Sequence, residues 1–277
     1  MTNNQEEFYR RLSGVYDQLF PVEADTLEFL RRSGARPGRT VLDLACGSGL
    51  YTESLIAEGV DAYGLDASPD LIELAKKRSA EPGRFMVADM RDIGCLVRSG
   101  PDAPPPGLPP GKEPRGTDPR GNEPPGSFDL VFCIGNSLAH LGSLAEVRTV
   151  VDGIAGSLTD GRGTAVVQYV DMQDFPVGGA RELPSLHAEN TIFERSYLRT
   201  SPDHIIFNAV LVDAASGVRD ELQNELLVLR TEDLTNWFSS GGLSVEIRGG
   251  FGGQPLEGSW VRVLCASTPR RDADTAL

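Results

Sequence analysis

The 277-residue chain contains few cysteines and histidines and lacks a long apolar run. Its four cysteines are scattered and form no CxxC pair, so we expect buried reduced thiols rather than disulfides or a metal site. The first residues, MTNNQEEFYRR, lack the apolar core of a signal peptide, and no apolar run reaches membrane-spanning length. These absences predict a cytoplasmic protein without a membrane partner.

Basic residues are also scarce. The chain has 26 lysines and arginines against 40 aspartates and glutamates, which gives a formal net charge of -14 and a pI of about 4.7. The overall field therefore repels polyanions, and no run of lysine and arginine forms a local basic patch. This balance argues against nucleic acid and acidic membranes as partners and is compatible with a small-molecule substrate.

The first two thirds of the chain alternate between apolar strand-like segments and segments with helical spacing. Apolar rather than alternating strands are typical of a parallel sheet covered by helices on both faces. We therefore predict an α/β fold with a doubly wound, mostly parallel seven-stranded sheet. The expected strands are 40–45, 61–68, 84–89, 128–135 and 163–171, with 243–249 and 260–267 completing the sheet.

The C-terminal third has a different pattern. Segments 191–200, 204–213 and 221–230 alternate partly with a period of two and are separated by turn residues, which predicts an antiparallel sheet with hairpin connections. We divide the chain into units that follow these changes. They are a helical cap (1–39), a core (40–171 and 230–268), an antiparallel insertion over the active site (172–229) and a flexible tail (269–277).

Residues 98–127 interrupt the core and contain ten of the nineteen prolines. Such a composition cannot bury a core, so we expect an extended, disordered surface insertion. A protein-docking arm and an active-site lid are the functional alternatives.

The segment VLDLACGSGLYT (41–52) ends a buried strand in a glycine loop that leads into a helix. Gly47 and Gly49 permit positive φ and a close approach to the backbone, and the helix start supplies unpaired N–H groups. The third glycine of the dinucleotide motif GxGxxG is missing, which argues against an NAD-dependent dehydrogenase.

Three acids are expected along the same edge of the sheet. Asp66 ends the second strand, nineteen positions after Gly47, where a carboxylate accepts hydrogen bonds from a ribose diol. Asp89 ends the third expected strand and suits an exocyclic amine such as that of adenine. Asp43 lies in the first strand, where it could face an ammonium. The set matches a ligand with an amino-acid cation, a ribose and an adenine, and matches a pyrophosphate poorly.

The motifs VLDLACGSG, YGLDAS, VADM and FDLVFCIGNSLAHL, in this order, resemble those of the class I S-adenosylmethionine-dependent methyltransferases over about residues 8–268. The resemblance implies S-adenosylmethionine as the cofactor. It also implies that Tyr16, in the leading helix, closes over the cofactor. The remaining implied cofactor contacts are Asp43, Ala45, Gly47, Gly49, Asp66, Ala67, Asp89, Met90, Ile134, Gly135 and Asn136.

A narrower resemblance, to glycine and sarcosine N-methyltransferases, comes from GNSLAHL after the fourth strand and from the antiparallel insertion, which would form a wall over the substrate. It implies methyl transfer to a small-molecule amine, such as an amino acid. An O-methyltransferase of a small metabolite and a catalytically inactive cofactor-binding scaffold remain alternatives.

Several polar residues are candidates for handling the acceptor. Asn136 and Ser137 could orient it, and His140, on one helical face with Asn136, could take a proton or hold a carboxylate. Arg181, in an expected loop, is the candidate clamp for a substrate carboxylate because arginine suits bidentate pairing. Arg195 and Arg199 are rivals that we expect to be solvated surface charges.

Overall fold

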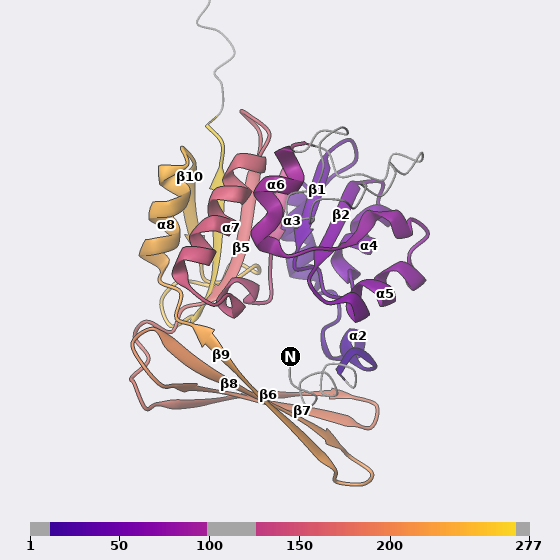
Figure 1. Cartoon of the computed structure of the whole chain (residues 1–277), viewed down its shortest axis with the longest axis vertical. Helices are drawn as coiled ribbons and strands as arrows, with labels where there is room; N and C mark the ends of the chain where they lie inside the picture. Colours follow the sequence, from indigo (N-terminus) through magenta and orange to yellow (C-terminus); the bar gives the residue numbers. More distant parts are fainter. Residues whose placement is uncertain (1–11, 99–125, 270–277) are drawn as a thin grey trace, which may run out of the picture.

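The computed structural model describes residues 12–98 and 126–269, and it contains two sheets (Figure 1). The larger sheet has seven strands in the order β10-β11-β5-β4-β1-β2-β3, and β11 is antiparallel to both of its neighbours. This confirms the predicted fold class. The strands are β1 (Thr40–Leu44), β2 (Asp61–Asp66), β3 (Phe85–Val87), β4 (Leu130–Cys133), β5 (Thr164–Val170), β10 (Ser244–Arg248) and β11 (Val261–Ser267).

Helices pack on both faces of this sheet, as the buried apolar side chains of its central strands require. One face is covered mainly by α6, α7 and α8, and the other by α3, α4 and α5. Their bounds are α3 (Ala24–Ser33), α4 (Leu50–Ala57), α5 (Pro69–Arg78), α6 (Ile93–Arg98), α7 (Leu144–Ser157) and α8 (Thr231–Ser240). Short 3-10 helices are η1 (Pro82–Arg84), η2 (Met90–Asp92) and η3 (Ser137–His140).

Two helix starts follow from local sequence. The Ser68 hydroxyl caps α5 by accepting a hydrogen bond from the Leu71 amide at 3.4 Å, and Pro69 occupies the first helical position. Ser143 caps α7 in the same way through the Glu146 amide. Both caps fix helices that follow strands of the parallel sheet, so they help to set where the connecting loops emerge.

The second sheet has four antiparallel strands in the order β6-β7-β8-β9, at one end of the molecule below the larger sheet (Figure 1). They are β6 (Ala180–Ala188), β7 (Thr191–Arg199), β8 (His204–Asp213) and β9 (Arg219–Leu227). The sequence expectation of a loop around Arg181 was wrong. Residues 180–188 have mostly exposed side chains, mix polar with apolar residues and include Pro184, so they do not show the apolar signal of a strand, yet they pair with β7 as an edge strand.

The N-terminal part of the described chain forms α2 (Tyr16–Leu19), which lies between α5 and the four-stranded sheet (Figure 1). Leu19 of this helix and Leu12, which precedes it, are buried against apolar side chains of that sheet, including Phe193 and Leu222. The helix therefore bridges the two sheets.

Parts of the expected organisation lie outside the described residues. These are the proposed insertion, of which only the ends are described, and almost all of the proposed tail. In the described part of the chain, no helix combines the length and apolar character needed to cross a membrane.

Candidate active site

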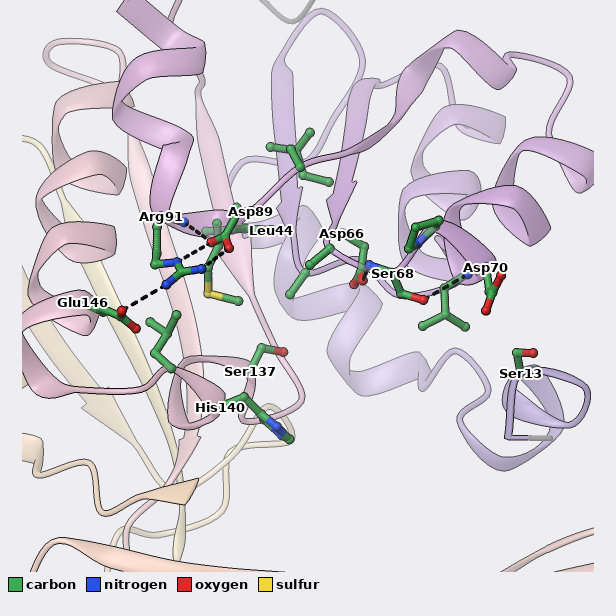
Figure 2. Close-up of a pocket in the computed structure, with 18 of the residues that line it drawn as sticks. Ser13, Leu44, Asp66, Ser68, Asp70, Asp89, Arg91, Ser137, His140 and Glu146 are labelled. Atoms are coloured by element: carbon green, nitrogen blue, oxygen red, sulfur yellow. Dashed lines mark hydrogen bonds and ion pairs between the residues drawn. The ribbon is translucent and has the colours of Figure 1, made fainter. Parts of the chain in front are cut away.

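A cavity of about 600 Å³ lies at the carboxyl ends of β1, β2 and β3 (Figure 2). Ligands bind at this edge in doubly wound sheets, because the connecting loops separate there. Ala45, Asp66, Ala67, Asp89 and Met90 all line it, as the resemblance implies. The parallel register thus brings together residues that are far apart in the sequence.

The Asp66 carboxylate is held in one orientation by the backbone. One oxygen accepts a hydrogen bond from the Gly47 amide and the other from the Ser68 amide, both at 2.8 Å. Each carboxylate oxygen retains a further lone pair for a ligand hydroxyl. Burial raises the pKa of Asp66, while these amide hydrogen bonds oppose the rise.

The space beside both loop glycines is filled by the protein itself. Gly47 and Gly49 have φ of 58° and 74°. A Cβ atom on Gly47 would lie 2.9 Å from the Tyr16 hydroxyl oxygen, and one on Gly49 would lie 2.4 Å from a ring carbon of Phe85. Side chains are therefore excluded at these positions by backbone conformation and by packing, apart from any need to admit a ligand.

Asp43 lies beneath the cavity rather than among its lining residues. It is 3% exposed, and its carboxylate accepts a hydrogen bond from the Thr52 hydroxyl at 2.7 Å. Burial raises the pKa of Asp43 to about 7, with a smaller contribution from the charge of Asp66. Its contact with a ligand ammonium stays a prediction.

Asp89 lies two residues beyond the end of β3 and is part of an ion-pair network that sequence reasoning missed. The Arg91 guanidinium contacts Asp89 at 2.6 Å and Glu146, on α7, at 3.0 Å (Figure 2). These bonds hold the pKa of Asp89 below its ordinary value. Arg91 and Glu146 line the same cavity and link its η2 side to α7.

A second cavity, of about 620 Å³, lies between the edge of the large sheet and the four-stranded sheet. Ile134, Gly135 and Asn136 line it from the loop after β4, and the Gly135 amide donates a hydrogen bond to the Gln168 side chain at 2.8 Å. Leu12, Tyr16 and His140 line both cavities. The two spaces therefore adjoin at these three residues.

Tyr16 is placed at this junction by contacts of its own helix. The Asp17 carboxylate accepts hydrogen bonds from the Ser48 hydroxyl and the Arg78 guanidinium, both at 2.5 Å, and these bonds fasten α2 to the glycine loop and to α5. Burial, together with nearby carboxylates, raises the pKa of Tyr16 far above its ordinary range. Its hydroxyl therefore stays protonated.

The segment after β4 differs from the expected regular helix. Residues 137–140 form a 3-10 helix with about three residues per turn, so Asn136 and His140 do not share a helical face. The Asn136 side chain accepts a hydrogen bond from the Val170 amide at 3.0 Å, whereas the imidazole of His140 borders both cavities. The His140 side chain is exposed, and the desolvation caused by the protein around it lowers its pKa, which favours the neutral ring near pH 7.

Ser137 lines the first cavity rather than the second. Its hydroxyl donates a hydrogen bond to the Ile134 carbonyl at 2.8 Å. The predicted role of Ser137 in binding the acceptor therefore has no support from its position.

The three candidate arginines occupy different environments. Arg181 packs over the Trp260 ring, 4.6 Å from its centre, and lies outside both sets of lining residues. The expectation that Arg199 is a solvated surface charge was wrong. It is 7% exposed, and its guanidinium donates to carbonyl groups of the chain between β5 and β6 and after β7. These belong to Met172, Gln173, Phe175, Ser201 and Pro202.

Arg195 was also expected at the solvated surface. It is instead partly buried and lines the second cavity, which corrects that expectation. Arg195, rather than Arg181, is therefore the arginine that lines this cavity.

Comparison with known proteins agrees with this geometry. Residues 42–163 match the family described as a methyltransferase domain. The chain is 26% identical over 136 residues to a glycine/sarcosine N-methyltransferase of Parasynechococcus marenigrum, which covers 49% of this chain and 40% of that protein. Residues 42–163 therefore carry a methyltransferase domain.

A longer match covers 82% of this chain and 80% of a Saccharopolyspora spinosa dTDP-4-amino-2,3,4,6-tetradeoxy-D-glucose N,N-dimethyltransferase, at 25% identity. The fold is that of a solved S-adenosylmethionine-dependent methyltransferase from Clostridium acetobutylicum, with a TM-score of 0.67. That alignment has 14% identity and covers 95% of this chain and 99% of the solved one.

The family match includes only part of the site. Asp66, Asp89 and the segment after β4 lie within residues 42–163 of the methyltransferase domain, whereas β6 to β9 follow it. The first cavity is thus formed largely by the matched region, apart from α2 and its flanks. One wall of the second cavity is formed by the four-stranded sheet, which lies outside the region matched by the methyltransferase family.

Proposed function

We propose that this protein transfers a methyl group from S-adenosylmethionine to a small-molecule amine. The observation that carries the proposal is the junction of two cavities at Tyr16 and His140. One cavity has the acids suited to an adenosyl ligand, and the other is enclosed by a separate sheet. A methyl group bound in the first would have a short path to an acceptor in the second.

The residues of the first cavity fit the cofactor. Asp66 presents two backbone-oriented oxygens at the end of β2, as a ribose diol requires. Asp89 has a lowered pKa and remains ionised, so it can accept a hydrogen bond from an adenine amine, while the adjacent Met90 offers apolar contact. When bound, S-adenosylmethionine would supply an activated methyl group on a sulfonium.

The residues at the junction would orient the acceptor and handle its proton. A nucleophilic amine must be uncharged, and neutral His140 can accept a proton from an ammonium that enters the second cavity. Tyr16 stays protonated and lines both spaces. Asn136, fixed by the Val170 amide, would hold the loop after β4 at the required position. Alignment and exclusion of water would provide the remaining rate enhancement.

Nitrogen is the favoured nucleophile because the glycine/sarcosine and amino-sugar relatives are both named as N-methyltransferases. The glycine/sarcosine match covers less than half of that relative, so it does not identify the acceptor. Formation of S-adenosylhomocysteine with matched panels of amines and alcohols would distinguish N-methylation from O-methylation. Turnover of alcohols alone would contradict the proposed amine.

Calorimetric titration with S-adenosylhomocysteine tests the cofactor assignment. We expect Asp66→Ala to weaken binding by about tenfold to a hundredfold, because hydrogen bonds to charged groups contribute about 1.5–3 kcal/mol. Asp66→Asn should bind with intermediate affinity, since it keeps one carbonyl-type oxygen. Asp152→Asn, which removes an exposed carboxylate paired with Arg148 on α7, serves as the control. Equal affinities for all four proteins would refute the assignment of Asp66 to the ribose.

A further inference from the structure

One face of the four-stranded sheet forms a continuous wall of the second cavity. Side chains alternate across a strand, so Phe193, Arg195 and Tyr197 of β7 share a face. Arg195 pairs in register with Leu183 of β6 and with Ala209 of β8. All five residues line the cavity, and Arg195 is the one formally charged residue among the lining residues from these strands.

The Arg195 guanidinium has few hydrogen-bond partners within the protein. One terminal nitrogen donates a hydrogen bond to the Pro184 carbonyl at 2.8 Å, and Nε is buried without a hydrogen-bond partner. Within the described ranges, its recorded partners include no carboxylate. Its nearest ring, that of Phe193, lies 5.7 Å from the guanidinium carbon. A partly buried cation without a counter-ion is costly, so the sequence retains an unfavourable group at this place.

The comparison with Arg199, four residues further along the same strand and on the same face, is informative. Arg199 is more deeply buried, but carbonyl oxygens of two loops satisfy its guanidinium, which gives it a structural role. Arg195 has one such carbonyl and faces the cavity. A structural role like that of Arg199 therefore does not explain why a charged residue lies at position 195. An anionic ligand in the cavity would explain it.

The volume and lining of the cavity add a second property. A space of about 620 Å³ falls in the range of sites for drug-sized ligands and exceeds the needs of an amino acid as small as glycine. Aromatic side chains from the four-stranded sheet and from the loop before β11 line it, among them Tyr197, Phe207, Phe251 and Trp260. These walls suit a flat or bulky apolar body.

We propose that the acceptor carries an oxyanion, which Arg195 binds, on an apolar body larger than glycine. This inference rests on the proposed function, because it concerns the acceptor of that reaction. A carboxylate and a phosphate both present oxygens to a guanidinium. Glu23 is the acidic residue among the described lining residues, and it lies on the opposite wall at the start of α3, where the Thr26 hydroxyl contacts it at 3.4 Å. It therefore leaves the charge of Arg195 available.

Binding to the full chain saturated with S-adenosylhomocysteine tests this proposal. The probes are phenylalanine with phenylalaninamide, tyramine phosphate with tyramine, and glycine. We expect the anion of at least one matched pair to bind about tenfold or more tightly than its neutral partner, because charge-assisted hydrogen bonds are the stronger ones. The pair that shows this preference distinguishes a carboxylate from a phosphate. In the pair that shows the preference, we expect the anion and its neutral partner each to bind more tightly than glycine.

Variants separate recognition from folding. Arg195→Gln should abolish the preference for the anion while changing affinity for the neutral partner by less than about twofold, and Arg195→Lys should restore part of it. Arg219→Gln, which removes an arginine paired with Glu194 on the opposite face of the same sheet, should leave the preference intact.

Three results would overturn the inference. The first is that the unmodified protein binds the anion no more tightly than the neutral probe in either pair. The second is that Arg195→Gln weakens the binding of the anion and of its neutral partner by the same factor. The third is that glycine binds most tightly of all the probes. Failure to bind S-adenosylhomocysteine would instead refute the proposed function.

Discussion

The carboxylate of Asp43 should make the protein less stable as the pH rises. Asp43 lies in β1, just before the glycine loop. It is 3% exposed, and its side chain accepts a hydrogen bond from the Thr52 hydroxyl. Burial raises its pKa from the ordinary value of 3.8 to about 7. The folded protein therefore binds a proton on Asp43 over a pH range in which the unfolded chain has released it.

The sign and size of the effect follow from this difference. Below pH 3.8 the carboxyl is protonated in both states and no penalty arises. Between pH 3.8 and about 7 the unfolded state binds fewer protons, so the free energy of unfolding falls as pH rises. At about 1.36 kcal/mol per pKa unit, the interval from 3.8 to about 7 corresponds to about 4 kcal/mol. The loss is nearly complete once the pH exceeds the folded-state pKa.

Asp43→Asn removes this titration while keeping an oxygen that can accept the hydrogen bond from Thr52. Urea denaturation of both proteins without ligand, from about pH 4 to about pH 8, measures the effect. We expect the stability of Asp43→Asn relative to the unmodified chain to increase by about 4 kcal/mol across this range. The contributions of the other acids cancel to first order in the difference. A difference that stays constant with pH would refute the reasoning.

Three further substitutions test other parts of the structure. Gly49→Ala should destabilise the fold by about 2 kcal/mol or more, measured by urea denaturation, because φ is 74° and the new methyl would lie 2.4 Å from Phe85; an unchanged midpoint would contradict this packing. Arg199→Met should cost about 3 kcal/mol or more in thermal or chemical unfolding, since buried carbonyl groups lose their donors. Protonation of His140 should lower kcat/KM only below about pH 6.5, because the pKa of His140 is reduced. His140→Gln should abolish this decrease in a plot of kcat/KM against pH.

The segments of the parallel sheet could be predicted because their signals are local. Buried parallel strands have uninterrupted apolar side chains, and the Ser68-Pro69 pair starts a helix by satisfying its own first turn. The position of Asp66 follows from the same logic, because an acid that ends a parallel strand must lie at the carboxyl edge of the sheet. These features need only a few neighbouring residues.

Local rules failed for β6 and for the segment after β4. An edge strand with exposed side chains has no apolar periodicity, so residues 180–188 were expected to be a loop. The spacing of Asn136 and His140 was interpreted with the period of an α-helix, whereas the 3-10 period separates their side chains. In both places the backbone conformation is set by pairing and loop closure that the residues themselves do not encode strongly.

The large sheet, its glycine loop and the acids along its edge could be predicted from the amino-acid sequence, because strand composition and motif spacing are properties of contiguous residues. The sequence does not reveal that Arg195 rather than Arg181 lines the second cavity, that Tyr16 lies against Gly47, or that burial raises the pKa of Asp43 to about 7; the packing of the folded chain sets all three. Those outcomes depend on how two sheets and α2 pack together. Burial and charge pairing are set by neighbours distant in the chain, so no single segment contains them.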